Sequence, residues 1–238
     1  MIFGKPAHGG GEKREGTMLE FKNVTGTGKK FRLEQISFAA REGYLTGIAG
    51  KNGAGKTTLF HYMMDEKIPY EGEILFRGKN IKEDHAAFRA MLGYVSDERR
   101  FFENYTGKRN AELLSVFYPD WDMDLFLEAL GEMGVSREKN LMHLSRGEYL
   151  KFQMAFAMGH DAKLFLLDEV TGGMDPVFRR DFYKLLHGLI AKEDITILMT
   201  THIEEEIELH MDYLGIMENG RMTSFGEVGE SNGTDERI

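Results

Sequence analysis

The sequence contains no cysteine, so it can form no disulfide, thiolate metal site or thiol nucleophile, which fits a reducing compartment. The chain has a deficit of positive charge: it carries 30 lysine and arginine residues against 39 aspartate and glutamate residues, which gives a formal net charge of -9. This deficit argues against a broad nucleic-acid-binding surface. No apolar run approaches the roughly 20 residues of a membrane-spanning helix, and the first residues lack an apolar signal core. We therefore expect a chain that does not bind nucleic acid and reaches a membrane only through a partner.

The segment 50–58 is the most informative stretch of the sequence. It matches G-x-x-x-x-G-K-[ST] at every fixed position and lies between a predicted strand, 44–49, and a predicted helix, 57–64. Its glycines let successive backbone N–H groups gather around an anion, and the helix start adds free N–H groups and a positive dipole end. Lys56 would lie between the β- and γ-phosphates, and the Thr57 hydroxyl would bind Mg²⁺. A plain glycine-rich turn would not need this Lys-Thr pair. The segment predicts a nucleoside triphosphate site formed by Gly50, Lys51, Asn52, Gly53, Ala54, Gly55, Lys56, Thr57 and Thr58.

The length of 238 residues suits one large α/β domain with a smaller subdomain. Residues 1–17, with three consecutive glycines and mixed charge, are predicted to be a flexible lead-in outside the fold. We expect a single domain over 18–226 and a polar tail over 227–238. Within the domain, apolar residues at helical spacing predict a helical insertion at about 97–160.

Hydrophobic periodicity predicts alternating strands and helices along the domain. Strands 18–25 and 31–40 would form an antiparallel flank. The mainly apolar runs 163–167 and 195–200 are typical of parallel strands buried on both faces. Together with the phosphate loop, they predict an α/β P-loop NTPase core of mostly parallel strands. The other predicted strands are 72–76, 92–95, 213–217 and 221–225, and the other predicted helices are 84–91, 110–118, 123–133, 146–158, 176–191 and 204–210.

Two further segments carry acidic residues where chemistry could occur. Asp168 and Glu169 follow an apolar run, so their carboxylates would lie at the exposed end of a buried strand; two acids can also simply end a strand. Ser145 and Glu148 fit S-x-x-E, which predicts a capping box at a helix start. A capped helix start with free N–H groups is also an anion site, so the two interpretations are compatible.

Two single residues, His202 and Asp175, are also candidate site residues because of their positions at the ends of predicted elements. His202 comes after Thr-Thr at the end of a predicted core strand, on the ligand side of an open α/β sheet, although a lone histidine can also be structural. Asp175 precedes Pro176, a pair that predicts a helix N-cap followed by proline at the first helical position.

In their order along the chain, five segments resemble motifs of the nucleotide-binding subunit of ATP-binding cassette (ABC) transporters. The resemblance extends from about Met18 to Phe225 and implies the ABC ATPase fold. It also implies that Asp168 holds Mg²⁺ through a water, that Glu169 polarises the attacking water, and that His202 contacts the γ-phosphate. The segments are Gly50–Thr58, Leu144–Glu148, Leu164–Glu169, Gly173–Pro176 and Thr201–His202.

The same resemblance implies a second subunit. In the family, the signature segment, here Ser145, Arg146, Gly147 and Glu148, meets the γ-phosphate of ATP held by the opposite subunit of a head-to-tail dimer. Asp175 would belong to the loop that crosses the dimer interface, beside its competing role as an N-cap.

The sequence departs from the family pattern at three places. Arg146 and Glu148 stand where the usual Leu-Ser-Gly-Gly-Gln has glycine and glutamine. Asp97 aligns with a glutamine that usually joins Mg²⁺, and a carboxylate is a competent ligand for that ion. Phe31 is the only aromatic candidate to stack on adenine, and it could equally belong to the core.

The resemblance implies a clamp: two copies, or one copy and a paralogue, close around two Mg·ATP and drive a separate membrane subunit from its cytoplasmic face. Phe101, Phe102 and Tyr105 are candidate contacts to that subunit, or they pack within the insertion. The Arg-Gly-Glu signature and the segment 118–122 most resemble ATPase subunits of bacterial exporters for antibiotics or amphipathic peptides, such as phenol-soluble modulins.

Two alternatives come from other functional classes. A soluble ABC ATPase of translation or repair would usually bring a second cassette or a long coiled-coil insertion with a basic surface. A regulatory clamp that senses ATP without hydrolysing it would be expected to lack the acid at Glu169.

Overall fold

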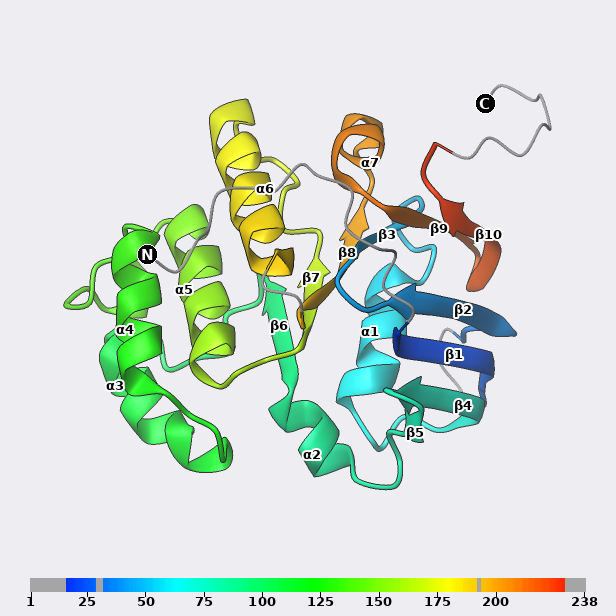
Figure 1. The fold of residues 1–238 in the computed structure, drawn as a ribbon, viewed down its shortest axis with the longest axis horizontal. Helices are drawn as coiled ribbons and strands as arrows, with labels where there is room; N and C mark the ends of the chain where they lie inside the picture. The colour runs from blue at the N-terminus through cyan, green and yellow to red at the C-terminus, as the bar shows by residue number, and fades with distance from the viewer. Residues whose placement is uncertain (1–15, 29–31, 192–193, 230–238) are drawn as a thin grey trace.

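Two β-sheets lie side by side with helices around them in the computed structural model, which describes residues 16–28, 32–191 and 194–229 (Figure 1). The larger sheet has the strand order β10-β9-β3-β8-β7-β6. Its pairings β3 with β8, β3 with β9, β7 with β8 and β6 with β7 are parallel, and only β10 runs antiparallel to its neighbour. The predicted core of mostly parallel strands is confirmed. The strands are β3 Leu45–Ala49, β6 Leu92–Ser96, β7 Leu164–Asp168, β8 Thr196–Thr201, β9 Tyr213–Glu218 and β10 Arg221–Glu227.

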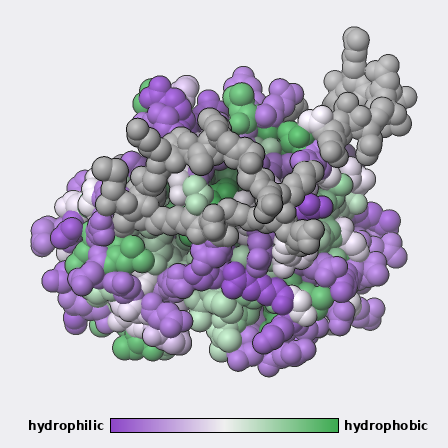
Figure 2. All heavy atoms as spheres, viewed as in Figure 1, coloured by the Kyte–Doolittle hydropathy of each residue, from purple (hydrophilic) through white to green (hydrophobic). Residues whose placement is uncertain are grey.

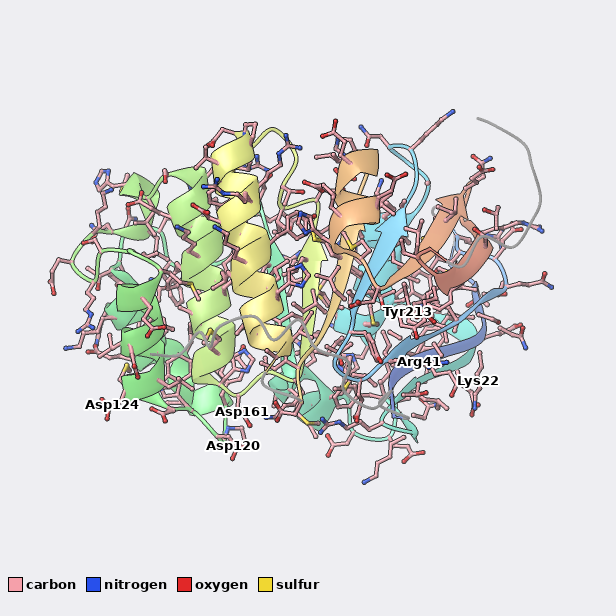
Figure 3. All side chains as sticks on the ribbon, turned by 45° about the horizontal axis from the view of Figure 1, so that its top comes forward. Lys22, Arg41, Asp120, Asp124, Asp161 and Tyr213 are labelled. Atoms are coloured by element: carbon pink, nitrogen blue, oxygen red, sulfur yellow. The ribbon has the colours of Figure 1, made fainter. Side chains whose placement is uncertain are left out.

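The smaller sheet is antiparallel and has the order β2-β1-β4-β5. Its strands are β1 Thr17–Gly26, β2 Ile36–Arg41, β4 Tyr70–Phe76 and β5 Lys79–Asn80. The second strand begins later than predicted, because Gln35 has a φ of 51°, which interrupts the extended path. Figure 3 shows Arg41 of this sheet beside Tyr213 of the larger one, with the guanidinium carbon 5.4 Å from the ring centroid.

Strand β7 shows how the core fixes the site. Its side chains alternate between the two hydrophobic cores, so that Phe165 and Leu167 pack into one while Leu164 and Leu166 pack into the other. All four side chains are fully buried. The carboxyl end of β7, which carries Asp168, is therefore held from both faces of the sheet.

The helices follow the predicted order, with small shifts at their ends. The third begins at Gly107 rather than 110, because the Thr106 hydroxyl accepts a hydrogen bond from the Arg109 N–H and caps it. Within the described ranges, every helix is too short or too polar to span a bilayer. The helices are α1 Lys56–Met64, α2 His85–Ala90, α3 Gly107–Leu114, α4 Met123–Glu132, α5 Arg146–Gly159, α6 Pro176–Ile190 and α7 Glu204–His210.

Helices α3, α4 and α5 lie together at one side of the molecule (Figure 1). Aromatic rings from the flanking loops pack against α5: Phe101 lies 4.9 Å from both Phe152 and Phe156, and Trp121 lies 4.9 Å from Phe156, measured between ring centroids. This cluster anchors α5, whose first turn carries the signature segment. On the face seen in Figure 2, apolar side chains are scattered among hydrophilic ones.

Candidate functional site

The segment 50–58 joins β3 to α1: residues 50–55 form the loop, and residues 56–58 are the first turn of the helix. Gly53 and Gly55 have φ angles of 82° and 111°, in the region that favours glycine, and Gly55 is the N-cap of α1. The Lys56 side chain, only 3% exposed, turns back into the loop. Its Nζ donates to the carbonyl oxygens of Gly50 at 2.7 Å and Lys51 at 3.3 Å. The loop is thus folded around the Lys56 ammonium group.

The same ammonium joins the loop to the end of β7. Lys56 Nζ lies 2.9 Å from Glu169 Oε1, so the structure brings these two predicted site residues together. Glu169 has a φ of 50°, an uncommon conformation for a residue other than glycine and one that is concentrated at functional sites. Its N–H donates to Thr200 Oγ1 at 2.9 Å, which helps to hold this backbone conformation.

Asp168 is oriented by two hydroxyl groups. Thr200 Oγ1 donates to Asp168 Oδ1 at 2.7 Å, and the Tyr94 hydroxyl lies 3.3 Å from Oδ2. Burial, reinforced by the Asp168 charge, raises the pKa of Tyr94, which keeps the phenol protonated as a donor. Sequence reasoning missed Thr200 and Tyr94. No local sequence signal indicated them, because they reach Asp168 only through the sheet register, which pairs Asp168 with Thr200 of β8 and with Ser96 of β6, two residues beyond Tyr94.

The residues present fit a magnesium ion that arrives with a nucleotide. Thr57 is exposed at the first turn of α1, and Asp168 offers an oriented, partly exposed carboxylate. Among the residues that the structure describes, no cluster of three or more histidine, cysteine, aspartate or glutamate side chains could hold a metal ion. This sparse set matches Mg²⁺, which commonly takes one or two protein ligands together with substrate phosphates and water.

The signature segment opens α5 with the predicted capping box. Ser145 Oγ accepts from the Glu148 N–H at 3.2 Å, and Glu148 Oε2 accepts from the Ser145 N–H at 2.7 Å. The hydrogen bond from the Ser145 backbone lowers the pKa of the Glu148 carboxyl, which therefore stays ionised. A Cβ at Gly147 would lie 2.6 Å from Phe178 Cε2 of α6, so glycine permits close helix packing here. The local capping interpretation is confirmed, and the Ser145 side chain is exposed.

The remaining candidates lie on loops around this site. His202 is exposed just after β8, and a Cβ at Gly172 would lie 3.5 Å from its Cε1. Asp175 caps α6, because its Oδ1 accepts from the N–H groups of Val177 and Phe178 at 3.0 and 2.9 Å. Phe31 lies outside the described residues.

Asp97 and Arg146, two of the residues that depart from the family pattern, contact each other. Arg146 Nε and Nη2 donate to the two carboxylate oxygens of Asp97 at 2.5 and 2.6 Å. Both oxygens of Asp97 are therefore engaged by Arg146, and the role of Asp97 as a magnesium ligand stays a prediction. Nothing in the local sequence signalled this pair, because 49 positions separate its members.

Two buried polar side chains that the sequence did not single out hold the surrounding loops. Gln153 of α5 accepts from the Ser96 N–H at 3.2 Å and donates to the Ser96 carbonyl at 2.8 Å. Glu206 of α7 accepts from the hydroxyls of Thr171 and Thr201, both at 2.8 Å. The loops after β6, β7 and β8 are thus tied to helices at the same end of the sheet.

Known proteins share both the sequence pattern and this fold. The family model described as "ABC transporter" matches residues 33–172. The chain is 31% identical over 200 residues to the ABC transporter ATP-binding protein YtrB of Bacillus subtilis (strain 168), covering 83% of this chain and 68% of that protein. It is 27% identical over 216 residues to the bacitracin transport ATP-binding protein BcrA of Enterococcus faecalis, covering 90% of this chain and 70% of that protein.

Solved structures agree with the fold. The structure of cbiO1 from Clostridium perfringens, part of the ABC transporter complex cbiONQ, aligns with a TM-score of 0.77 at 26% identity, covering 91% of this chain and 90% of that chain. An ATP-binding subunit of an ABC transporter aligns with a TM-score of 0.78 at 23% identity, covering 89% and 90%. The chain belongs to the ABC transporter family, as an ATP-binding domain with ATPase activity.

Proposed function

We propose that two copies of this chain close head to tail around two Mg·ATP, that hydrolysis reopens them, and that this cycle drives a separate membrane subunit. The contact that carries the proposal is the ion pair of Lys56 with Glu169, which joins the phosphate loop to the acid that would act on water. Ser145 is exposed on α5, and Figure 1 shows α5 and α1 on opposite sides of β6 and β7. The signature of one copy is therefore available to the nucleotide of another.

On this account, the triphosphate enters the loop and competes with Glu169 for the Lys56 ammonium. The released Glu169 carboxylate then accepts a proton from the attacking water. Thr57 and Asp168 would hold Mg²⁺, which neutralises charge that develops on the phosphates. His202 would contact the γ-phosphate from the end of β8, while Asp175 would lie at the interface between copies.

A groove of about 770 Å³ between α1, α2 and α5 suits a short helix from the membrane subunit. Its apolar lining includes Phe117, which is 73% exposed. Phe102 and Tyr105 are also exposed and stay candidate contacts. Phe101 differs, because its ring packs against Phe152 and Phe156 of α5, as the alternative interpretation expected. Docking in this groove would hold the chain at the cytoplasmic face of the membrane.

For the cargo, we propose a peptide or drug that is exported. The support comes from relatives: BcrA is named for bacitracin transport, and YbhF of Escherichia coli (strain K12), 29% identical over 220 residues, is named as a probable multidrug transporter protein. This chain covers 37% of YbhF. Exporters of the phenol-soluble modulin type remain the finer proposal, and assembly of this chain with an importer-type membrane subunit would contradict it.

The oligomeric cycle can be tested with a variant that binds ATP without hydrolysing it. We expect Glu169→Gln to sediment as a dimer with Mg·ATP and as a monomer without nucleotide, because bound ATP would bridge the phosphate loop of one copy and Ser145 of the other. The control is Glu169→Gln combined with Lys56→Met, which should stay monomeric in ATP. A Glu169→Gln protein that binds ATP yet remains monomeric would contradict the proposed clamp.

A further inference from the structure

Arg146 joins three segments that come from different parts of the chain. It is the first residue of α5, and its guanidinium binds Asp97, which follows β6. The same guanidinium donates through Nη1 to the carbonyl oxygen of Gly172, in the loop after β7. The Arg146 side chain is 36% exposed and that of Asp97 is 52% exposed, so this junction lies at the surface.

These contacts hold the Arg146 guanidinium in place but use only some of its N–H donors. A guanidinium carries five N–H donors in a rigid plane. In the described structure, three hydrogen bonds engage Nε, Nη1 and Nη2, so one N–H on each terminal nitrogen is left over. The bidentate pair with Asp97 sets the plane, and the Gly172 carbonyl holds the other terminal nitrogen. The two remaining donors are thus held in a fixed orientation by Asp97 and the Gly172 carbonyl.

The local charge favours an anion at this place. Arg146 stands at the first position of α5, where the positive end of the helix dipole disfavours a cation. The only carboxylate that the described structure pairs with its guanidinium is Asp97. Glu148, the other acid of this turn, caps the backbone and pairs with Lys139 at 3.3 Å. A phosphate arriving here would meet a guanidinium, free helix N–H groups and the Ser145 hydroxyl.

We propose that Asp97 is a positioning residue: together with the Gly172 carbonyl, it aims the Arg146 guanidinium at the γ-phosphate of the ATP held by the second copy. The inference rests on the proposed head-to-tail dimer. It replaces the expected magnesium role of Asp97, because both carboxylate oxygens are already bound to Arg146. Asp97 would then act on the nucleotide of the partner, through Arg146, rather than on its own.

A double-mutant cycle tests this role. Glu169→Gln is the parent, and the affinity of its Mg·ATP-dependent dimer is measured for Asp97→Asn, Arg146→Met and the pair. Residues of one salt-bridge network couple by about 2- to 150-fold. We expect Asp97→Asn to weaken the dimer about tenfold when Arg146 is present and less than twofold when it is Met. The unfolding midpoint should stay unchanged, since exposed ion pairs contribute little to stability.

The possible outcomes distinguish failure of the role proposed for Asp97 from failure of the proposed dimer. An equal loss from Asp97→Asn in both backgrounds would overturn the inference while leaving the clamp intact. A higher Mg²⁺ concentration for half-maximal ATP binding in Asp97→Asn would overturn it too, in favour of the magnesium role. Absence of any ATP-dependent dimer in the parent would overturn the proposed function and this inference together. Glu98→Gln, one position along the same loop, is the matched control and should leave the dimer affinity unchanged.

Discussion

Glu169→Gln should lower kcat for ATP hydrolysis by about 10²- to 10⁴-fold, the usual contribution of a general base. Glutamine keeps the size of the side chain but cannot accept the proton of the attacking water. The loop contacts of Lys56 to Gly50 and Lys51 do not involve Glu169, so the phosphate loop keeps its shape. ATP should therefore bind the variant at least as tightly, because the carboxylate that competes for the Lys56 ammonium is gone. Single-turnover hydrolysis and equilibrium binding of a fluorescent ATP analogue measure the two effects separately.

The matched control is Glu73→Gln, an exposed glutamate of β4 in the antiparallel sheet. It makes the same chemical change away from the loop, so kcat should stay within a factor of about two, as for surface substitutions. If Glu169→Gln hydrolysed ATP at the rate of the unmodified protein, the assignment of Glu169 as the base would be wrong.

Lys56→Met should weaken ATP binding by about 10- to 150-fold, the equivalent of the roughly 1.5–3 kcal/mol of a hydrogen bond to a charged group. The side chain is 3% exposed and donates to two loop carbonyls, so methionine removes both the phosphate contact and the internal support of the loop. Titration of the ATP analogue, monitored by fluorescence anisotropy, gives the change in dissociation constant.

Lys22→Met is the control for this change. Lys22 lies on β1 with 46% of its side chain exposed, and Figure 3 labels it on the antiparallel sheet. Its substitution removes the same charge without touching the loop, so ATP affinity should not change. Tight ATP binding by Lys56→Met would show that the triphosphate is held elsewhere.

Much of this architecture could be predicted because its signals are local. Strand β7 is a run of apolar residues that ends in Asp168, with Glu169 next, and both its burial on two faces and the place of Asp168 follow from that pattern. The capping box of Ser145 with Glu148 spans four consecutive positions and needs no knowledge of the fold. The phosphate loop is likewise continuous in sequence.

The contacts that complete the site were out of reach because they depend on how distant segments meet. Thr200 and Tyr94 reach Asp168 only through the register of β8 and β6 with β7. The pairing of Arg146 with Asp97 joins a helix start to a loop of another part of the chain. Strand β4 was predicted as a strand, yet its place in the antiparallel sheet comes from pairing with β1, which no local pattern encodes.

The central claim, a site shared between two copies, is tested most directly by mixing two inactive variants. Glu169→Gln keeps Ser145, and Ser145→Arg keeps Glu169 while blocking the signature, so a mixed dimer contains one intact composite site. Equal amounts of the two variants are combined without nucleotide and then given Mg·ATP. Random pairing makes about half of the dimers mixed, and each mixed dimer has one of its two sites intact. The mixture should therefore recover about a quarter of wild-type hydrolysis. Hydrolysis by the mixture no greater than the mean of the two separate variants would contradict a site completed by the second copy.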